Sequence, residues 1–199
     1  MRYRVRYSIM ARDVSTSSED PFVLAGMRVL AENGAAELTL RRVAEAAGAS
    51  TMGIYTRFGS RAGMLEAIYR RGFELLRDAL IGARDKEDDR IVALGVAYRR
   101  FALANPPLYA LMFERPLPGF DPSPQTRTDA LAMTFGLLTD EIPDPARAYL
   151  VWTAVHGIVS IELTHAQRSP LPGFFIDFPA EGEQLLIDGV TALLRGLPA

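Results

Sequence analysis

The sequence has no cysteine, only two histidines (His156 and His165) and one tryptophan (Trp152) among 199 residues. Without cysteine there can be no disulfide, thiolate metal site, iron–sulfur cluster or cysteine nucleophile, and two histidines supply a zinc site poorly. We therefore expect no metal and no cofactor. No apolar run approaches the roughly 18 residues needed to cross a membrane, so no membrane partner is expected. The first residues also lack the apolar core of a signal peptide, which favours a cytoplasmic location.

The charge is nearly balanced overall but uneven along the chain. There are 22 basic and 24 acidic residues, a formal net charge of −2, and Lys86 is the single lysine. Residues 1–61 carry nine arginines against six acids, whereas the remainder is acidic. A basic front end on an acidic body suggests contact with a polyanion, although a solvated face is the alternative.

Hydrophobic periodicity and helix-capping residues predict an all-α protein with about nine helices and no strands. Proline-bearing loops are expected at 116–124 and 170–179. The helices are predicted to cover residues 21–33, 40–47, 51–58, 61–84, 91–105, 107–114, 125–141, 145–168 and 181–194.

The second and third predicted helices lie only three residues apart and meet at Gly48. Such a tight turn forces two helices to cross steeply, which is typical of a helix-turn-helix. Small Ala44 suits the contact between them, and Ile54 is expected to point into the core. There is no acid between Ser50 and Arg61. A helix that lies against phosphates is expected to lack acids in this way. The outward residues of the predicted helix over 51–58 are Thr51, Met52, Gly53, Thr56 and Arg57.

The segment TLRRVAEAAGASTMGIYTRFGSR resembles the DNA-binding segment of TetR-family transcriptional regulators, and the resemblance covers residues 21–69. Its marks are the spacing of Tyr55 and Phe58 and the basic Arg61 that follows them. The resemblance implies phosphate contacts from Thr39, Ser50, Tyr55 and Arg61. It places Arg41, Thr51, Met52, Gly53 and Arg57 at or near base edges, with Thr56 on the same face.

These residue types suit the implied roles. Thr39 and Ser50 begin helices, whose first N–H groups favour phosphate. Arginine can bind guanine bidentately, with roughly 1–3 kcal/mol of discrimination against the wrong base. Met52 offers an apolar contact, for instance to a thymine methyl, and Gly53 suits close approach to DNA. The alternatives are that Tyr55 and Phe58 belong to the core and that Arg42 is a solvated charge.

The sequence departs from the family pattern before its first helix, where SSEDP is acidic rather than basic. An arginine-rich arm over residues 1–18 precedes it, with Arg2, Arg4, Arg6 and Arg12. This arm is expected to be disordered. It could instead reach a minor groove, or it could be an upstream extension if Met10 is the true start.

Residues 63–199 are predicted to form a ligand-binding and dimerisation domain beside a DNA-binding domain over residues 19–62. The segments NPPLYALMFERP and YLVWTAVHGIVSIEL resemble a C-terminal subgroup marked by Trp152, His156 and Gly157. Trp152 and His156 are four residues apart, so they share one helical face. The predicted apolar pocket, with His156 as a polar anchor, comprises Tyr98, Phe101, Tyr109, Met112, Phe113, Met133, Trp152 and His156. The alternative is a packed core in which His156 makes a structural hydrogen bond.

A homodimer is expected because one helix-turn-helix reads few base pairs, whereas a two-fold dimer reads a palindrome. Helices over 149–167 and 181–194 would pair with their symmetry mates. Phe174, Phe175, Ile176 and Phe178 would cover that interface or the mouth of the pocket.

The sequence thus predicts a transcriptional regulator, a repressor released from operator DNA by a small apolar or aromatic effector. The alternatives are a helix-turn-helix protein without an effector and a small helical enzyme. The enzyme is not expected, because no nucleophile, metal cluster or phosphate loop accompanies His156.

Overall fold

The computed structural model describes residues 20–115, 117–166 and 176–196. Within these residues all regular structure is helical, which confirms the predicted all-α class. The elements are α1 (Pro21–Asn33), η1 (Ala35–Glu37, a 3₁₀ turn), α2 (Leu40–Ala46), α3 (Thr51–Phe58), α4 (Arg61–Arg84), α5 (Arg90–Ala104), α6 (Pro106–Phe113), α7 (Pro124–Glu141), α8 (Pro145–Ala166) and α9 (Phe178–Gly196). None of these helices is long and apolar enough to cross a membrane.

Side-chain caps fix the beginnings of the helices near the N-terminus. The hydroxyls of Thr39, Ser50 and Ser60 accept hydrogen bonds from backbone N–H groups in the first turns of α2, α3 and α4. Each cap satisfies a donor that the helix itself leaves unpaired. Gly48 and Gly59 follow α2 and α3 with φ of 65° and 73°, a conformation that favours glycine. These local signals explain why the bounds of α3 match the prediction.

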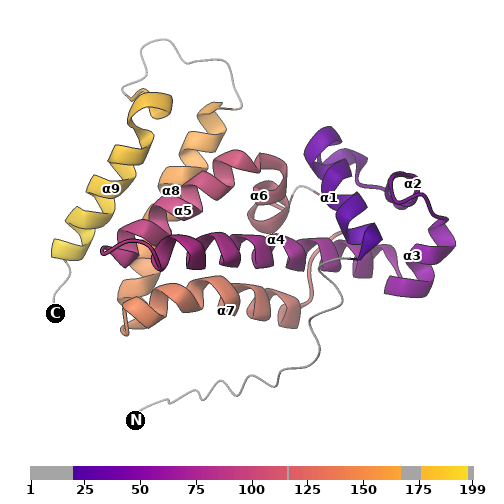
Figure 1. Cartoon of the computed structure of the whole chain (residues 1–199), viewed down its shortest axis with the longest axis horizontal. Coiled ribbons are helices and arrows are strands. Elements are labelled where there is room, and N and C mark those ends of the chain that lie inside the picture. The colour runs from indigo at the N-terminus through magenta and orange to yellow at the C-terminus, as the bar shows by residue number, and fades with distance from the viewer. Residues whose placement is uncertain (1–19, 116, 167–175, 197–199) are drawn as a thin grey trace.

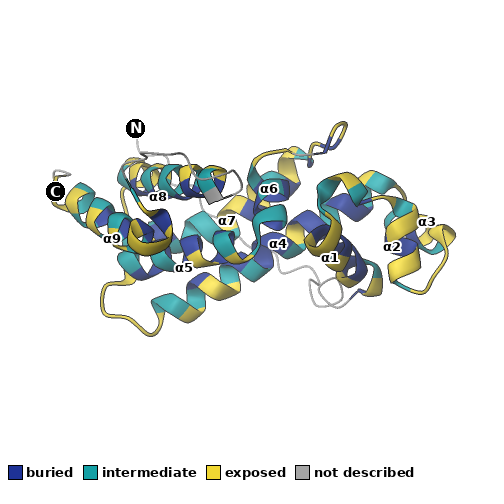
Figure 2. Cartoon of the chain, turned by 90° about the horizontal axis from the view of Figure 1, so that it is seen from above, coloured by how far each residue is buried: buried dark blue, intermediate teal, exposed yellow. Residues whose placement is uncertain are grey.

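The helices form two groups joined by α4. Helices α1 to α3 gather at one end of the molecule, whereas α5 and α7 pack along the rest of α4, and α8 and α9 pack on α5 (Figure 1). Buried residues lie on the inward faces of the helices, and the α2–α3 end is largely exposed (Figure 2). A displacement of α4 would therefore move helices in both groups.

Helix α4 contacts α6 closely at Gly72, near its midpoint. A Cβ atom built on Gly72 would lie 2.8 Å from the sulfur of Met112 and 2.9 Å from Cδ1 of Leu108. These distances are shorter than ordinary van der Waals contacts, so glycine lets the two helices approach. Closer to the N-terminus, Met64, Leu65 and Ile68 of α4 are fully buried and belong to the same core as α1.

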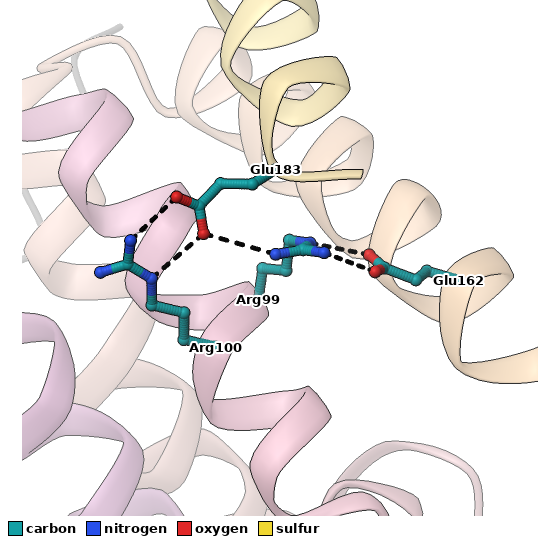
Figure 3. A network of polar contacts seen from close by, with 4 residues as sticks. All are labelled: Arg99, Arg100, Glu162 and Glu183. Carbon is teal, nitrogen blue, oxygen red and sulfur yellow. Dashed lines mark hydrogen bonds and ion pairs between the residues drawn. The ribbon is translucent and has the colours of Figure 1, made fainter. Parts of the chain in front are cut away.

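A buried ion-pair network joins α5, α8 and α9 (Figure 3). The guanidinium of Arg99 donates to both carboxylate oxygens of Glu162, at 2.8 and 2.6 Å, and both side chains are at least nine-tenths buried. Glu183 on α9 accepts from Arg99 at 3.4 Å and from Arg100 at 3.1 and 2.8 Å. Gly182 leaves room for the network, since a Cβ there would lie 2.9 Å from the Glu162 carboxylate. The network thus sets the position of α9.

The start of the last helix differs from the prediction. Phe178, expected in a loop, is the first residue of α9 and is buried, with its ring stacked 5.5 Å from that of His165. The Glu181 carboxylate accepts the N–H of Asp177 at 3.3 Å, which helps the helix begin before residue 181. Ile176 is partly buried. The predicted arm over residues 1–18 lies outside the described residues, and so do Phe174 and Phe175.

Candidate nucleic-acid interface and ligand cavity

Helices α2 and α3 form a tight helix-turn-helix. The backbone N–H of Ala49 donates to the carbonyl of Ala44 at 2.9 Å, which closes the turn at Gly48. Ala44 is almost fully buried where the helices meet, and Ile54 is fully buried beneath α3. The opposite face of α3 is therefore turned away from the core.

That outward face carries large side chains that the described part of the protein does not cover. The side chains of Met52 and Tyr55 are 69% and 48% exposed, and Thr51, Thr56 and Arg41 are also exposed. Arg61 is partly buried. Tyr55 is thus not a core residue, whereas Phe58 packs edge-to-face on Phe22 of α1, with ring centroids 6.2 Å apart. The interpretation of Phe58 as core is confirmed in part, because its side chain is partly buried.

Gly53 makes a packing contact that the sequence did not indicate. A Cβ atom on Gly53 would lie 2.8 Å from Cζ of Phe22, so the missing side chain makes room for the α1 ring. The packing of α3 against α1 therefore explains this glycine without any approach to DNA. Sequence reasoning missed this because Phe22 and Gly53 are distant in the chain.

Gly53→Ala is expected to destabilise the protein by up to about 2 kcal/mol, because overpacking outweighs the helix preference for alanine. In a Phe22→Leu background the same substitution should raise the free energy of unfolding by up to about 1 kcal/mol, because the clashing atom is gone. Chemical denaturation of the four proteins measures both effects. A loss of the same size in both backgrounds would contradict the proposed contact.

Arg57 also makes a contact that joins α3 to α1. Its Nε donates to Oδ2 of Asp20 at 2.8 Å, while Oδ1 of the same carboxylate accepts the N–H of Phe22 at 2.9 Å. The Asp20 side chain is only 6% exposed, against 50% for Arg57. The pair ties the end of α3 to the start of α1. The acidic SSEDP segment thus supplies the partner of an arginine that the sequence placed at base edges.

We expect Arg57→Ala to lower the free energy of unfolding by about 1–3 kcal/mol, because it leaves a buried carboxylate without its charged partner. Arg42→Ala is the matched control. Arg42 pairs with Glu37 at 2.9 Å, but both side chains are nearly half exposed, so its loss should cost no more than about 1 kcal/mol. Equal melting temperatures for the two variants would show that the Asp20 pair does not hold α3.

Polar groups that could meet phosphates flank the exposed face of α3. Thr39 and Ser50 are exposed at the first turns of α2 and α3, where the backbone N–H groups favour anions. Thr39 and Arg41 also line a shallow hollow with Arg42 and Glu45. The structure thus brings Thr39, Arg41, Ser50, Thr51, Met52, Tyr55 and Thr56 to one end of the molecule.

The C-terminal body contains a small, partly open apolar cavity of about 40 Å³ between α4, α5, α6, α7 and α8. Among the described residues, no charged side chain lines it. The lining residues are Leu80, Ile91, Leu94, Gly95, Tyr98, Phe113, Leu131, Thr134, Phe135, Leu138, Val151, Trp152 and Val155.

Of the eight predicted pocket residues, Tyr98, Phe113 and Trp152 line this cavity. The other five do not line it. Phe101 faces a separate surface groove, Met112 packs on Gly72, and the sulfur of Met133 lies 3.9 Å from Nη1 of Arg77. Tyr109 and His156 contact Tyr98 but do not border the cavity. Sequence reasoning missed Leu80 and the α5 and α7 wall, because helical periodicity marks the inward face but not the residues that reach one cavity.

His156 sits in a group of aromatic rings, with its Nδ1 within hydrogen-bonding distance of two phenols. Its Nδ1 lies 2.8 Å from the Tyr98 hydroxyl and 3.1 Å from the Tyr109 hydroxyl. The Trp152 ring stacks on the imidazole at 5.1 Å, as the four-residue spacing predicted. Burial lowers the pKa of His156, raises the pKa of Tyr98 and raises that of Tyr109 to about 12. These three side chains are therefore neutral near pH 7.

Helix α8 exposes several large apolar side chains to solvent. Tyr149, Leu150 and Ile161 are 58%, 49% and 51% exposed. Gly157 lies between them in the sequence, and a Cβ there would meet nothing within 4 Å. An exposed apolar surface of this kind is typical of a protein–protein interface.

These features define a helix-turn-helix protein with a helical C-terminal body. Residues 23–68 match the family model for bacterial regulatory proteins of the tetR family, and residues 91–173 match the model for the tetracyclin repressor-like C-terminal domain. The two models together cover more than half of the sequence. The chain belongs to the TetR family.

Similar proteins agree with this assignment. The HTH-type transcriptional regulator Rv1816 of Mycobacterium tuberculosis is 29% identical over 136 residues, which are 66% of this chain and 58% of Rv1816. The match thus spans less than two thirds of that relative. The crystal structure of SCO4313 has a TM-score of 0.70 at 25% identity, covering 87% of this chain and 93% of SCO4313. The fold also resembles that of a TetR variant of Acinetobacter baumannii AYE in complex with minocycline, with a TM-score of 0.60, 18% identity and coverage of 89% and 97%.

Proposed function

We propose that the chain is a homodimeric transcriptional repressor that binds a palindromic operator through α3 and releases it when an apolar effector binds. The observation that carries this proposal is the exposed face of α3. A short capped helix presents Met52 and Tyr55 to solvent with no acid among its residues. Contact with a DNA groove explains that combination better than solvation does.

The proposed division of roles follows the geometry. Thr39, Ser50, Tyr55 and Arg61 bind phosphates, and Arg41, Thr51, Met52 and Thr56 read base edges in the major groove. Gly53 and Arg57 act differently. They hold α3 against α1, so they position the reading side chains. Residues 19–62 form the DNA-binding domain in this proposal, and residues 63–199 form the ligand-binding and dimerisation domain.

The dimer is proposed to form through α8 and α9. Tyr149, Leu150 and Ile161 supply apolar area on α8, the Arg99–Glu162 pair holds α8 against α5, and Glu183 of α9 bonds to the same arginine. Pairing both helices with their symmetry mates gives a four-helix contact. The two heads then face the same side, as reading a palindrome requires.

Effector binding is proposed to reach the DNA-binding head through α6 and α4. Phe113 of α6 lines the cavity, and Leu108 and Met112 of the same short helix abut Gly72 of α4. A ligand that displaces Phe113 therefore presses on the helix that carries α1 to α3. The ligand must prefer the displaced state, because only differential affinity shifts an equilibrium.

Selection from a random pool of double-stranded DNA tests the proposed function. The full-length protein is expected to enrich a two-fold palindrome, and light scattering of the complex should give two chains per site or a multiple of two. Affinity for that site should fall steeply as salt rises, because bound phosphates release counterions. Failure to enrich any sequence would contradict the proposal.

A further inference from the structure

We propose that the cavity binds an uncharged aromatic ligand bearing a hydroxyl group, a phenol-class molecule whose O–H donates to the Tyr98 oxygen. This inference rests on the proposed function, since it names the chemical class of the effector. It is carried by the composition of the cavity wall and by the hydrogen bonding of the Tyr98–His156–Tyr109 group.

The wall excludes charged ligands. The polar side chains in the lining are those of Tyr98, Thr134 and Trp152, and none of them is charged. Thr134 already directs its hydroxyl toward the carbonyls of Ala130 and Leu131, at 3.3 and 3.4 Å. A carboxylate or ammonium group that entered the cavity would lose its water without gaining an ionic partner, which is strongly unfavourable.

The wall also favours an aromatic ligand. Tyr98, Phe113, Phe135 and Trp152 are contributed by four different helices, so aromatic faces or edges border the cavity on several sides. Aromatic rings pack well in offset or edge-to-face arrangements. A flat aromatic ligand can therefore replace contacts that these rings now make with one another.

Tyr98 supplies the point of polar recognition. With its hydrogen on Nε2, the tautomer in which Nδ1 accepts the Tyr98 hydroxyl, neutral His156 has one lone pair at Nδ1, and each phenol oxygen has two. Within the group only the two phenol hydrogens can fill these sites. Because in this tautomer Tyr98 can receive at most one hydrogen bond within the group, from Tyr109, at least one lone pair of the Tyr98 oxygen has no donor there. Tyr98 is 94% buried and borders the cavity, so a ligand that donates a hydrogen bond fits it.

Binding requires the cavity to enlarge. Its volume of about 40 Å³ is well below the ~150 Å³ of an engineered cavity that admits benzene. Phe135 and Trp152 are partly exposed and lie against the exposed ring of Tyr149, with centroids 6.3 and 5.5 Å away. These rings have room to turn outward, and Trp152 is the single tryptophan, so its fluorescence reports the change.

The test titrates the full-length protein with 4-propylphenol, 4-propylanisole and 4-propylbenzoate and follows Trp152 fluorescence. The three probes share a ring and a tail but differ in that the first has a donor, the second has none and the third is an anion. The phenol is expected to bind about 5- to 10-fold more tightly than the anisole, and the benzoate should not bind measurably.

Tyr98→Phe should reduce the preference for phenol over anisole to less than about twofold, and measurable binding of anisole shows that the variant keeps its cavity. Tyr109→Phe is the matched control, since it alters the same hydrogen-bonded group without bordering the cavity, and it should keep the preference. The proposal is overturned if wild-type protein binds phenol and anisole equally, binds none of the probes, or binds the benzoate best. Equal losses of preference in both variants would overturn direct contact with Tyr98.

Operator binding is measured in the same titration with labelled DNA, so the two proposals can fail separately. Phenol binding that leaves the operator complex intact would support the ligand class and contradict the effector role. Absence of phenol binding by a protein that still binds its operator would overturn the ligand class alone.

Discussion

Replacing Met52 with glutamate is expected to lower the affinity for the operator by a factor on the order of 100 while leaving the fold intact. Met52 is 69% exposed on α3, so the substitution removes little packing. In the proposed complex each new carboxylate faces phosphates and base edges. A cost of about 1.4 kcal/mol per carboxylate is a factor of ten, and the dimer carries two.

The matched control for this prediction is Ala132→Glu. Ala132 is also an exposed helical residue, but it lies on α7, in the body of the molecule. The Ala132→Glu substitution adds the same charge to the chain as Met52→Glu. It should change operator affinity by less than about threefold, since distant charges are screened by salt. If both variants bound DNA alike, Met52 would not lie in the DNA interface.

Glu162→Gln is expected to lower the free energy of unfolding by about 3–5 kcal/mol, because it leaves the buried guanidinium of Arg99 without its bidentate partner. In the proposed dimer the loss should be accompanied by dissociation, since Glu162 and Arg99 hold α8, a proposed interface helix, against α5. Denaturant unfolding and light scattering measure the two effects.

Glu183→Gln provides the comparison, because Glu183 belongs to the same network but is 38% exposed. Its Arg100 partner is 67% exposed, so removing the charge should cost no more than about 1 kcal/mol. Equal destabilisation by the two variants would contradict the view that the buried Arg99–Glu162 pair contributes most of the network's stability.

The sequence was sufficient for features that depend on neighbouring residues. The caps at Thr39, Ser50 and Ser60 and the positive-φ glycines Gly48 and Gly59 act within a few residues, so the bounds of α3 could be predicted. The same holds for the stacking of Trp152 on His156, which are one helical turn apart.

Features that depend on contacts between distant residues could not be predicted in this way. The Arg57–Asp20 pair and the fit of Phe22 over Gly53 both require the position of α1 relative to α3. Tyr98 and His156 are 58 residues apart, and no periodicity indicates that two phenols meet one imidazole. Composition suggested an apolar pocket, but tertiary packing decides which aromatic residues border it.

The absence of cysteine allows the position of α3 on DNA to be measured directly. Thr56→Cys introduces a single thiol on the exposed face of α3, and this thiol can be coupled to an iron chelate that cleaves nearby DNA. The selected operator should be cut at two symmetric positions about one helical turn apart, or a multiple of it, and a chelate at Ala132→Cys should give no cuts. Uniform cleavage from Thr56, or cleavage from Ala132 alone, would contradict the placement of α3 in the major groove.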